Sequence, residues 1–172
     1  MSAVLVVFDV NVLIGAVAGG RSDFESWPSP PPTSDNPFAD CLGITNDAKE
    51  FALCLSDHIL ENVAHVLTDD EYGFAWEPAV AEEYVDVLWD IAEASGGGVF
   101  EPQHTVHDCV DYEDNRILEA ALDSGAQLIV SDDHHLLDMN PWRGIPIITP
   151  REFASRTDAM RRQERRSHRG RR

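Results

Sequence analysis

Four acidic residues stand where apolar segments of the chain end or where helical patterns begin. They are Asp9, Glu61, Asp114 and Asp133. Asp9 directly follows the apolar run 3–8, and Asp133 lies just beyond the run 128–130. In a parallel sheet such runs are buried strands, and side chains at their carboxyl ends line the crevice where ligands bind. Carboxylates gathered there repel one another, so the pattern predicts a bound cation.

Each acid also has a purely structural interpretation. Asp111 and Asp114 stand at a helix start, where the first can cap the helix and the second can favour the helix dipole. Asp133 could likewise cap the helix that follows it, and Glu61 alone is typical of a solvated helix position. Asp9 could cap a helix, but a carboxylate behind six apolar residues is costly to bury without a partner.

Strands and helices are expected to alternate along the chain. The apolar patterns predict strands over 3–8, 52–55, 99–100, 127–130 and 145–149, and helices over 10–18, 57–67, 79–94, 111–124 and 134–137. Alternation of this kind predicts right-handed crossovers and a doubly wound parallel sheet. The expected fold class is therefore α/β, with three α/β/α layers around a central, mainly parallel twisted sheet. Pro146 places the last strand at a sheet edge.

Two segments depart from this alternation. Residues 19–46 are polar and rich in proline, which predicts a long loop or flap inserted at that point. Residues 161–172 offer almost no apolar side chain to bury, which predicts disorder when the tail is free. The expected organisation is one domain over 1–154 and an Arg-rich tail over 155–172.

Charge is unevenly distributed between these two parts. Residues 1–150 hold 28 acids and four bases, a net charge of -24, whereas residues 151–172 hold nine arginines and three acids, a net charge of +6. The body should repel polyanions and the tail should attract RNA or an acidic partner.

Length and composition favour a soluble single domain. The 172 residues suit one hydrophobic core. No stretch reaches the roughly 18 to 20 apolar residues that cross a bilayer, and no signal peptide is expected, so we expect a cytoplasmic protein without a membrane partner. Three widely spaced cysteines fit a reducing compartment. His104, His107 and Cys109 lie close together without a second half of a zinc site, which favours a structural role.

Several segments, taken in order, resemble the successive motifs of PIN-domain nucleases. They are residues 8–13, 56–61, 111–121 and 128–137, followed by a closing segment at 143–153. The resemblance spans about residues 3–154 and is closest in kind to the VapC-like branch, the toxins of toxin–antitoxin pairs. It implies a PIN-like fold and a ribonuclease that depends on a divalent metal. It also implies an antitoxin protein as partner and a homodimer.

The resemblance assigns roles to individual residues. Asp9, Glu61, Asp114 and Asp133 take the catalytic, metal-binding positions, and Asn11 helps to position them. Asn115 and Ser131 are expected to support the ligands through hydrogen bonds, or equally to serve ordinary helix-start chemistry. Many relatives have glycine where this chain has Asp132. Asp132 is therefore either an extra ligand or a sign that the register is shifted by one, and Asp111 is a further possible ligand.

The chemistry of the four acids independently favours Mg²⁺ or Mn²⁺ as the cofactor. These hard cations take about six oxygen ligands, so carboxylates and waters suit them. A bound ion neutralises the acids, polarises a phosphate oxygen and activates water for attack on phosphorus, and a second ion could stabilise the leaving oxygen. Adjacent His134 and His135 should point apart on a helix, which favours a solvated pair.

Two other classes of function remain open from the sequence. In the first, the chain is a non-catalytic PIN-like regulatory or binding module that recruits a partner through its Pro-rich insertion or basic tail. In the second, it is a phosphatase or receiver-like α/β protein, but the sequence has no phosphate-binding glycine loop. An intact set of four acids favours the enzyme.

Overall fold

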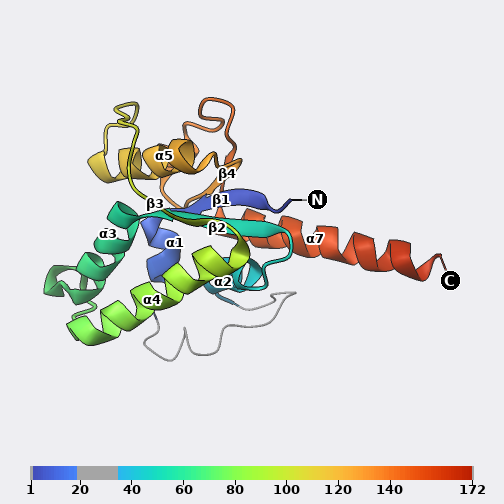
Figure 1. Ribbon diagram of the computed structural model, residues 1–172, viewed down its shortest axis with the longest axis horizontal. Helices are drawn as coiled ribbons and strands as arrows, with labels where there is room; N and C mark the ends of the chain where they lie inside the picture. The colour runs from blue at the N-terminus through green and yellow to red at the C-terminus, as the bar shows by residue number, and fades with distance from the viewer. Residues whose placement is uncertain (1, 19–34, 172) are drawn as a thin grey trace.

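The computed structural model of the chain describes residues 2–18 and 35–171 (Figure 1). The strands of its sheet are β1 (Val4–Phe8), β2 (Phe51–Ser56), β3 (Gly98–Phe100), β4 (Leu128–Val130) and β5 (Ile147–Ile148). The helices described are α1 (Val10–Gly15), α2 (Pro37–Asn46), α3 (Asp57–Thr68), the 3₁₀ turn η2 (Asp70–Tyr72), α4 (Pro78–Ser95), α5 (Tyr112–Ser124), α6 (His134–Leu137) and α7 (Pro150–Arg169). Residues 19–34, most of the expected insertion, lie outside the described residues.

The sheet is parallel throughout the described residues, with strand order β3-β2-β1-β4-β5. β1 occupies the centre, and its residues Val6, Val7 and Phe8 are completely buried because helices cover both faces. The chain moves outward from β1 through β2 to β3, and then returns to the other side of β1 with β4. The gap between the carboxyl ends of β1 and β4 is therefore the switch point at which ligands bind in folds of this kind.

Helices cover both faces of this sheet. Figure 1 shows α5 on one face and α1, α2 and α4 on the other. The start of α7 joins the core through Phe153, whose ring centroid lies 5.6 Å from that of Phe8 and 4.7 Å from that of Phe51. The expected three-layer α/β fold is confirmed, and β5, which follows Pro146, lies at the sheet edge as predicted. Within the described ranges, no helix has both the length and the apolar character needed to cross a membrane.

The prediction of a loop over 19–46 is wrong for the last ten residues, which form α2. The Asn36 side chain caps this helix by accepting hydrogen bonds from the amides of Phe38 and Ala39 at 3.0 and 3.2 Å. Pro37 suits the first helical position because its missing N–H would have no partner there. The helix buries Leu42 completely, so this stretch belongs to the core.

The disorder expected for the C-terminal tail is also wrong, because α7 continues without a break to Arg169. Arg161 anchors it: the side chain is 8% exposed, its Nε donates to Glu50 Oε1 at 2.7 Å, and its guanidinium lies 3.3 Å from Asp47 Oδ2. Beyond Arg161 the helix is exposed and rich in arginine. The boundary expected near residue 154 falls inside this helix.

Candidate metal centre at the carboxyl ends of β1 and β4

Asp9 stands at the end of the central strand and is 5% exposed. Its amide donates to the carbonyl of Val130 at 2.9 Å, which fixes it beside the end of β4. Asp9 precedes α1, but its side chain makes no capping hydrogen bond. Its Oδ2 instead accepts a hydrogen bond from the Ser131 hydroxyl at 2.7 Å. The capping role considered for Asp9 therefore does not explain why this carboxylate is buried.

Ser131 connects Asp9 with Asp133. Its buried hydroxyl oxygen donates to Asp9 and accepts from the amide of Asp133 at 2.9 Å. Asp133 in turn caps α6, because its Oδ1 accepts from the amide of His135 at 2.8 Å. The expected capping role of Asp133 is thus present. The expected support by Ser131 takes the form of a direct hydrogen bond.

Asp114 reaches the same place from the first turn of α5 and is 5% exposed. Asp111 caps this helix, with its Oδ1 accepting from the amides of Glu113 and Asp114 at 2.8 and 3.3 Å. Asn115 braces the preceding loop by donating to the carbonyls of Cys109 and Asp111 at 2.8 and 3.1 Å. Asp111 and Asn115 therefore position the helix start that carries Asp114.

The electrostatics of the three aspartates favour a bound cation. Burial, and secondarily the charge of Asp133, raises the pKa of Asp9 to about 6, against the lowering effect of Ser131 and the amides of Val10 and Asn11. Burial and then the charges of Asp133, Asp9 and Asp111 raise the pKa of Asp114 to about 6. The three carboxylates therefore lie within electrostatic reach of one another, and ionising all of them without a counter-ion is costly.

The oxygen donors of this cluster fit a divalent cation. Asp9 and Asp114 are nearly fully buried, so water alone cannot offset their charge, and their oxygens are the ligands that Mg²⁺ and Mn²⁺ prefer. Asp133 is less buried and leaves a route to the surface. The neighbouring Asp132 is exposed to solvent.

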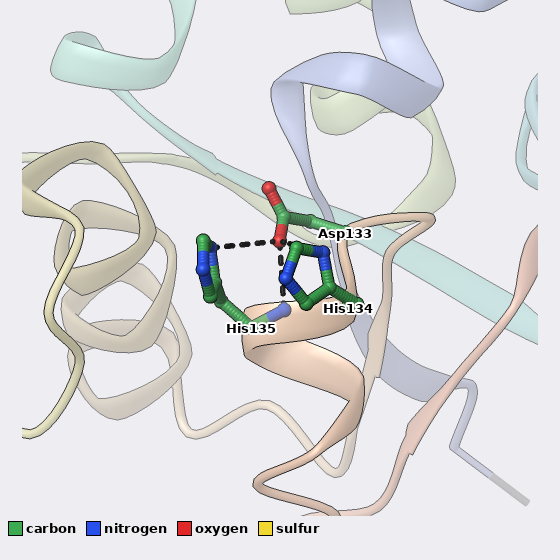
Figure 2. A group of neighbouring side chains, drawn as sticks. All are labelled: Asp133, His134 and His135. Atoms are coloured by element: carbon green, nitrogen blue, oxygen red, sulfur yellow. Dashed lines mark hydrogen bonds and ion pairs between the residues drawn. The ribbon is translucent and has the colours of Figure 1, made fainter.

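The two histidines of α6 do not point apart as expected. Their ring centroids lie 4.1 Å apart, and both rings flank the Asp133 carboxylate (Figure 2). His135 Nδ1 lies 3.3 Å from Asp133 Oδ1 and 3.7 Å from Asp114 Oδ2. His134 Nδ1 lies 3.9 Å from Asp133 Oδ1. The rings therefore lie together instead of apart, but both side chains are exposed, as expected for a solvated pair.

Glu61, the fourth acid of the predicted set, lies on α3. It is exposed on α3 and lines a shallow groove between α3 and α4 with Glu82 and Trp89. The face of α3 directed at α5 carries His58 and Asn62, which both hydrogen-bond Glu113 Oε2 at 2.9 Å. A catalytic role for Glu61 stays a prediction.

Asn11 and the loop residues His104 and Cys109 were also singled out in the sequence. Asn11 is exposed, and its backbone amide lowers the pKa of Asp9. His104 Nδ1 lies 2.5 Å from Asp123 Oδ1, and Cys109 Sγ donates to Asp114 Oδ2 at 3.6 Å. His104 and Cys109 therefore hold the loop between β3 and α5 by separate contacts, as a structural role requires.

The fold and the site together define an α/β protein with a carboxylate centre at the switch point of its parallel sheet. The family model of the PIN domain matches residues 5–135, and the chain belongs to this family, a family of metal-dependent nucleases. Neither the comparison with curated proteins nor that with solved structures gives a match. The matched range contains all four predicted acids, Asp9, Glu61, Asp114 and Asp133.

Proposed function

We propose that this chain is an endoribonuclease that uses Mg²⁺ or Mn²⁺ to cleave phosphodiester bonds of RNA. The observation that carries the proposal is the convergence of Asp9, Asp114 and Asp133 from three different elements, with two of these carboxylates nearly fully buried. A protein core accepts such a set when a cation compensates it. The resemblance to PIN-domain toxins favours RNA as the substrate.

In this proposal each residue of the centre has a distinct task. Asp9, Asp114 and Asp133 would hold the ion, which would act as a Lewis acid toward the scissile phosphate and toward water. Ser131 keeps Asp9 oriented by its hydrogen bond, and the capping contacts of Asp111 and Asp133 fix the two helix starts. Glu61, Asp132 and Asn11 remain proposed contributors to metal binding.

The test is cleavage of labelled single-stranded and hairpin RNA by purified protein. We expect cleavage with Mg²⁺ or Mn²⁺, none after thorough chelation, and none with Asp9→Asn or Asp114→Asn. Asp90→Asn, an exposed acid on α4, is the matched control and should retain full activity. Cleavage that persists in both site variants would show a contaminant or a different centre. Binding of RNA without cleavage would support the non-catalytic module.

We further propose that the enzyme is the toxin of a toxin–antitoxin pair and that it acts as a homodimer. The support is the resemblance in the order of its motifs. Induced expression should arrest bacterial growth, whereas Asp9→Asn should not. Co-expression of a small protein encoded immediately upstream should restore growth and co-purify with the chain, and light scattering should give the dimer mass. Unimpaired growth at confirmed expression would contradict the toxin role.

A further inference from the structure

Two imidazoles project over the carboxylate centre from the first turn of α6. Asp133, His134 and His135 each offer one ligand atom, and these three atoms all lie within 4.8 Å of one another. Figure 2 shows both rings close to the Asp133 carboxylate. A centre built from carboxylates alone would have only oxygen donors, so these nitrogens change the chemistry available to it.

His135 is the better placed of the two histidines. Its Nδ1 lies near an oxygen of two different aspartates, at 3.3 Å from Asp133 and 3.7 Å from Asp114. His134 approaches Asp133 alone, at 3.9 Å, and its side chain is 77% exposed against 49% for His135. The short turn of α6 therefore directs His135 toward the buried side of the centre and His134 toward solvent.

The distances around His135 suit ligands that share one ion. Two ligand atoms that each lie about 2.2 Å from a metal are roughly 3 Å apart when adjacent and roughly 4.4 Å apart when opposite. Both contacts of His135 fall within that range. Each of the two pairs, His135 with Asp133 and His135 with Asp114, therefore has a spacing that suits two ligands of one ion.

We propose that His135 is a nitrogen ligand of the metal, so that this centre is a mixed nitrogen–oxygen site selective for Mn²⁺ over Mg²⁺. The inference rests on the metal centre of the proposed function and adds the identity of one ligand and the preference for the metal. Mg²⁺ binds oxygen donors and keeps its waters, whereas first-row transition ions gain affinity from imidazole. His135 thereby favours the transition ion.

Pulsed electron paramagnetic resonance of the Mn²⁺-loaded full chain tests this directly. In the unlabelled wild-type protein, we expect the spectrum to show modulation from a directly coordinated ¹⁴N nucleus. When histidine alone is labelled with ¹⁵N, a ¹⁵N pattern should replace this modulation. His135→Gln should lose the signal, and His134→Gln should keep it. In calorimetry, His135→Gln should raise the Kd for Mn²⁺ about tenfold and that for Mg²⁺ less than about twofold.

Three outcomes would overturn the proposal. They are a Mn²⁺-saturated wild-type protein without nitrogen coupling, coupling that survives in His135→Gln, and equal loss of Mn²⁺ and Mg²⁺ affinity in that variant. The labelled wild-type measurement needs no variant, so it remains decisive if His135→Gln does not fold. This proposal and the proposed nuclease activity can fail separately. RNA cleavage without nitrogen coupling would refute only the assignment of His135 as a metal ligand. Nitrogen coupling without RNA cleavage would refute only the proposed ribonuclease activity.

Discussion

The Ser131 hydroxyl donates a 2.7 Å hydrogen bond to Asp9 Oδ2, although the two residues are 122 positions apart in the sequence. This bond joins the carboxyl ends of β1 and β4 and favours the ionised form of Asp9, lowering its pKa against the effect of burial. The same oxygen holds the amide of Asp133. The switch point of the sheet is therefore stabilised by one small side chain.

Ser131→Ala should weaken metal binding and stability together. Without the donor, the pKa of Asp9 should rise further, and the partly buried amide of Asp133 should lose its partner, at a cost of about 1 to 2 kcal/mol in the free energy of unfolding. Mn²⁺ calorimetry near pH 7 and urea unfolding measure both effects. Ser95→Ala removes another buried hydroxyl, bonded to the Leu53 amide at 2.8 Å. It should cost similar stability without loss of metal affinity, and equal metal affinity in both variants would refute the role of Ser131.

Asp9→Asn should stabilise the metal-free protein at neutral pH. The pKa of Asp9 is about 6 in the folded protein against 3.8 as the ordinary value, so the folded state holds the proton more tightly. The stability gained from the raised pKa of Asp9 is fully present below about pH 4. It is lost as pH rises through 6, which lowers the free energy of unfolding by up to about 3 kcal/mol. Urea unfolding in chelator from pH 4.5 to 7.5 should show this decline in wild-type protein and a flatter curve in Asp9→Asn. Parallel curves would contradict it.

Asp133→Asn should reduce Mn²⁺ affinity at least tenfold, whereas Asp132→Asn should change it less than about twofold. Asp133 acts electrostatically on both Asp9 and Asp114, while Asp132 is exposed. The two substitutions make the same chemical change at adjacent positions, so each is the control for the other. Equal losses would mean that both residues coordinate, and the reverse order would shift the register of the site by one.

Glu61→Gln should weaken Mn²⁺ binding less than Asp114→Asn does. Glu61 lies on the exposed groove between α3 and α4, whereas Asp114 is buried within the centre. Glu113→Gln is an informative comparison, because Glu113 stands next to Asp114 and contacts α3 through His58. Calorimetry on the three variants ranks the acids. If Glu61→Gln lost as much Mn²⁺ affinity as Asp114→Asn, Glu61 would count as a metal ligand.

The exposed arginines of α7 should contribute to RNA affinity but not to the chemical step. Replacing Arg162, Arg165, Arg166 and Arg169 by Gln should flatten the salt dependence of binding by about 0.7 for each phosphate that an arginine no longer neutralises. Arg161 must stay, because removing it would leave the Glu50 carboxylate without its ion pair and destabilise the protein by about 3 kcal/mol. Cleavage at saturating RNA should be unchanged. An unaltered salt slope would instead direct the search to an acidic protein partner.

The sequence predicts the parallel sheet well because the signals for its strands and helix ends are local. The apolar run before Asp9 can be buried only as a central strand, and Asp111 and Gly125 mark the ends of α5 by ordinary capping chemistry. The hydrogen bond of Ser131 with Asp9 could not be predicted in the same way. It depends on the pairing of β1 with β4, which places two distant segments side by side.

The sequence contains local helix-start signals for α2 and α7, but the composition of the surrounding residues favoured a loop and a disordered tail. Asn36 followed by Pro37 is a strong helix start, but the proline-rich stretch before it favoured a loop. Thr149, Pro150 and Glu152 begin α7 in the same manner, with the Thr149 hydroxyl accepting from the Glu152 amide at 3.2 Å. The buried ion pairing of Arg161, which anchors the polar half of α7, has no pattern in the sequence.

The length of α7 has a consequence for the size of a substrate. Twenty residues extend about 30 Å at 1.5 Å per residue, and Figure 1 shows the helix running to the C-terminus on the side where the N-terminus lies. Asp9 stands at the opposite end of its strand from that terminus. A strand stacked as in a double helix advances about 3.4 Å per nucleotide, so roughly nine nucleotides are needed to follow the full length of α7. A shorter stacked strand can follow only part of this helix.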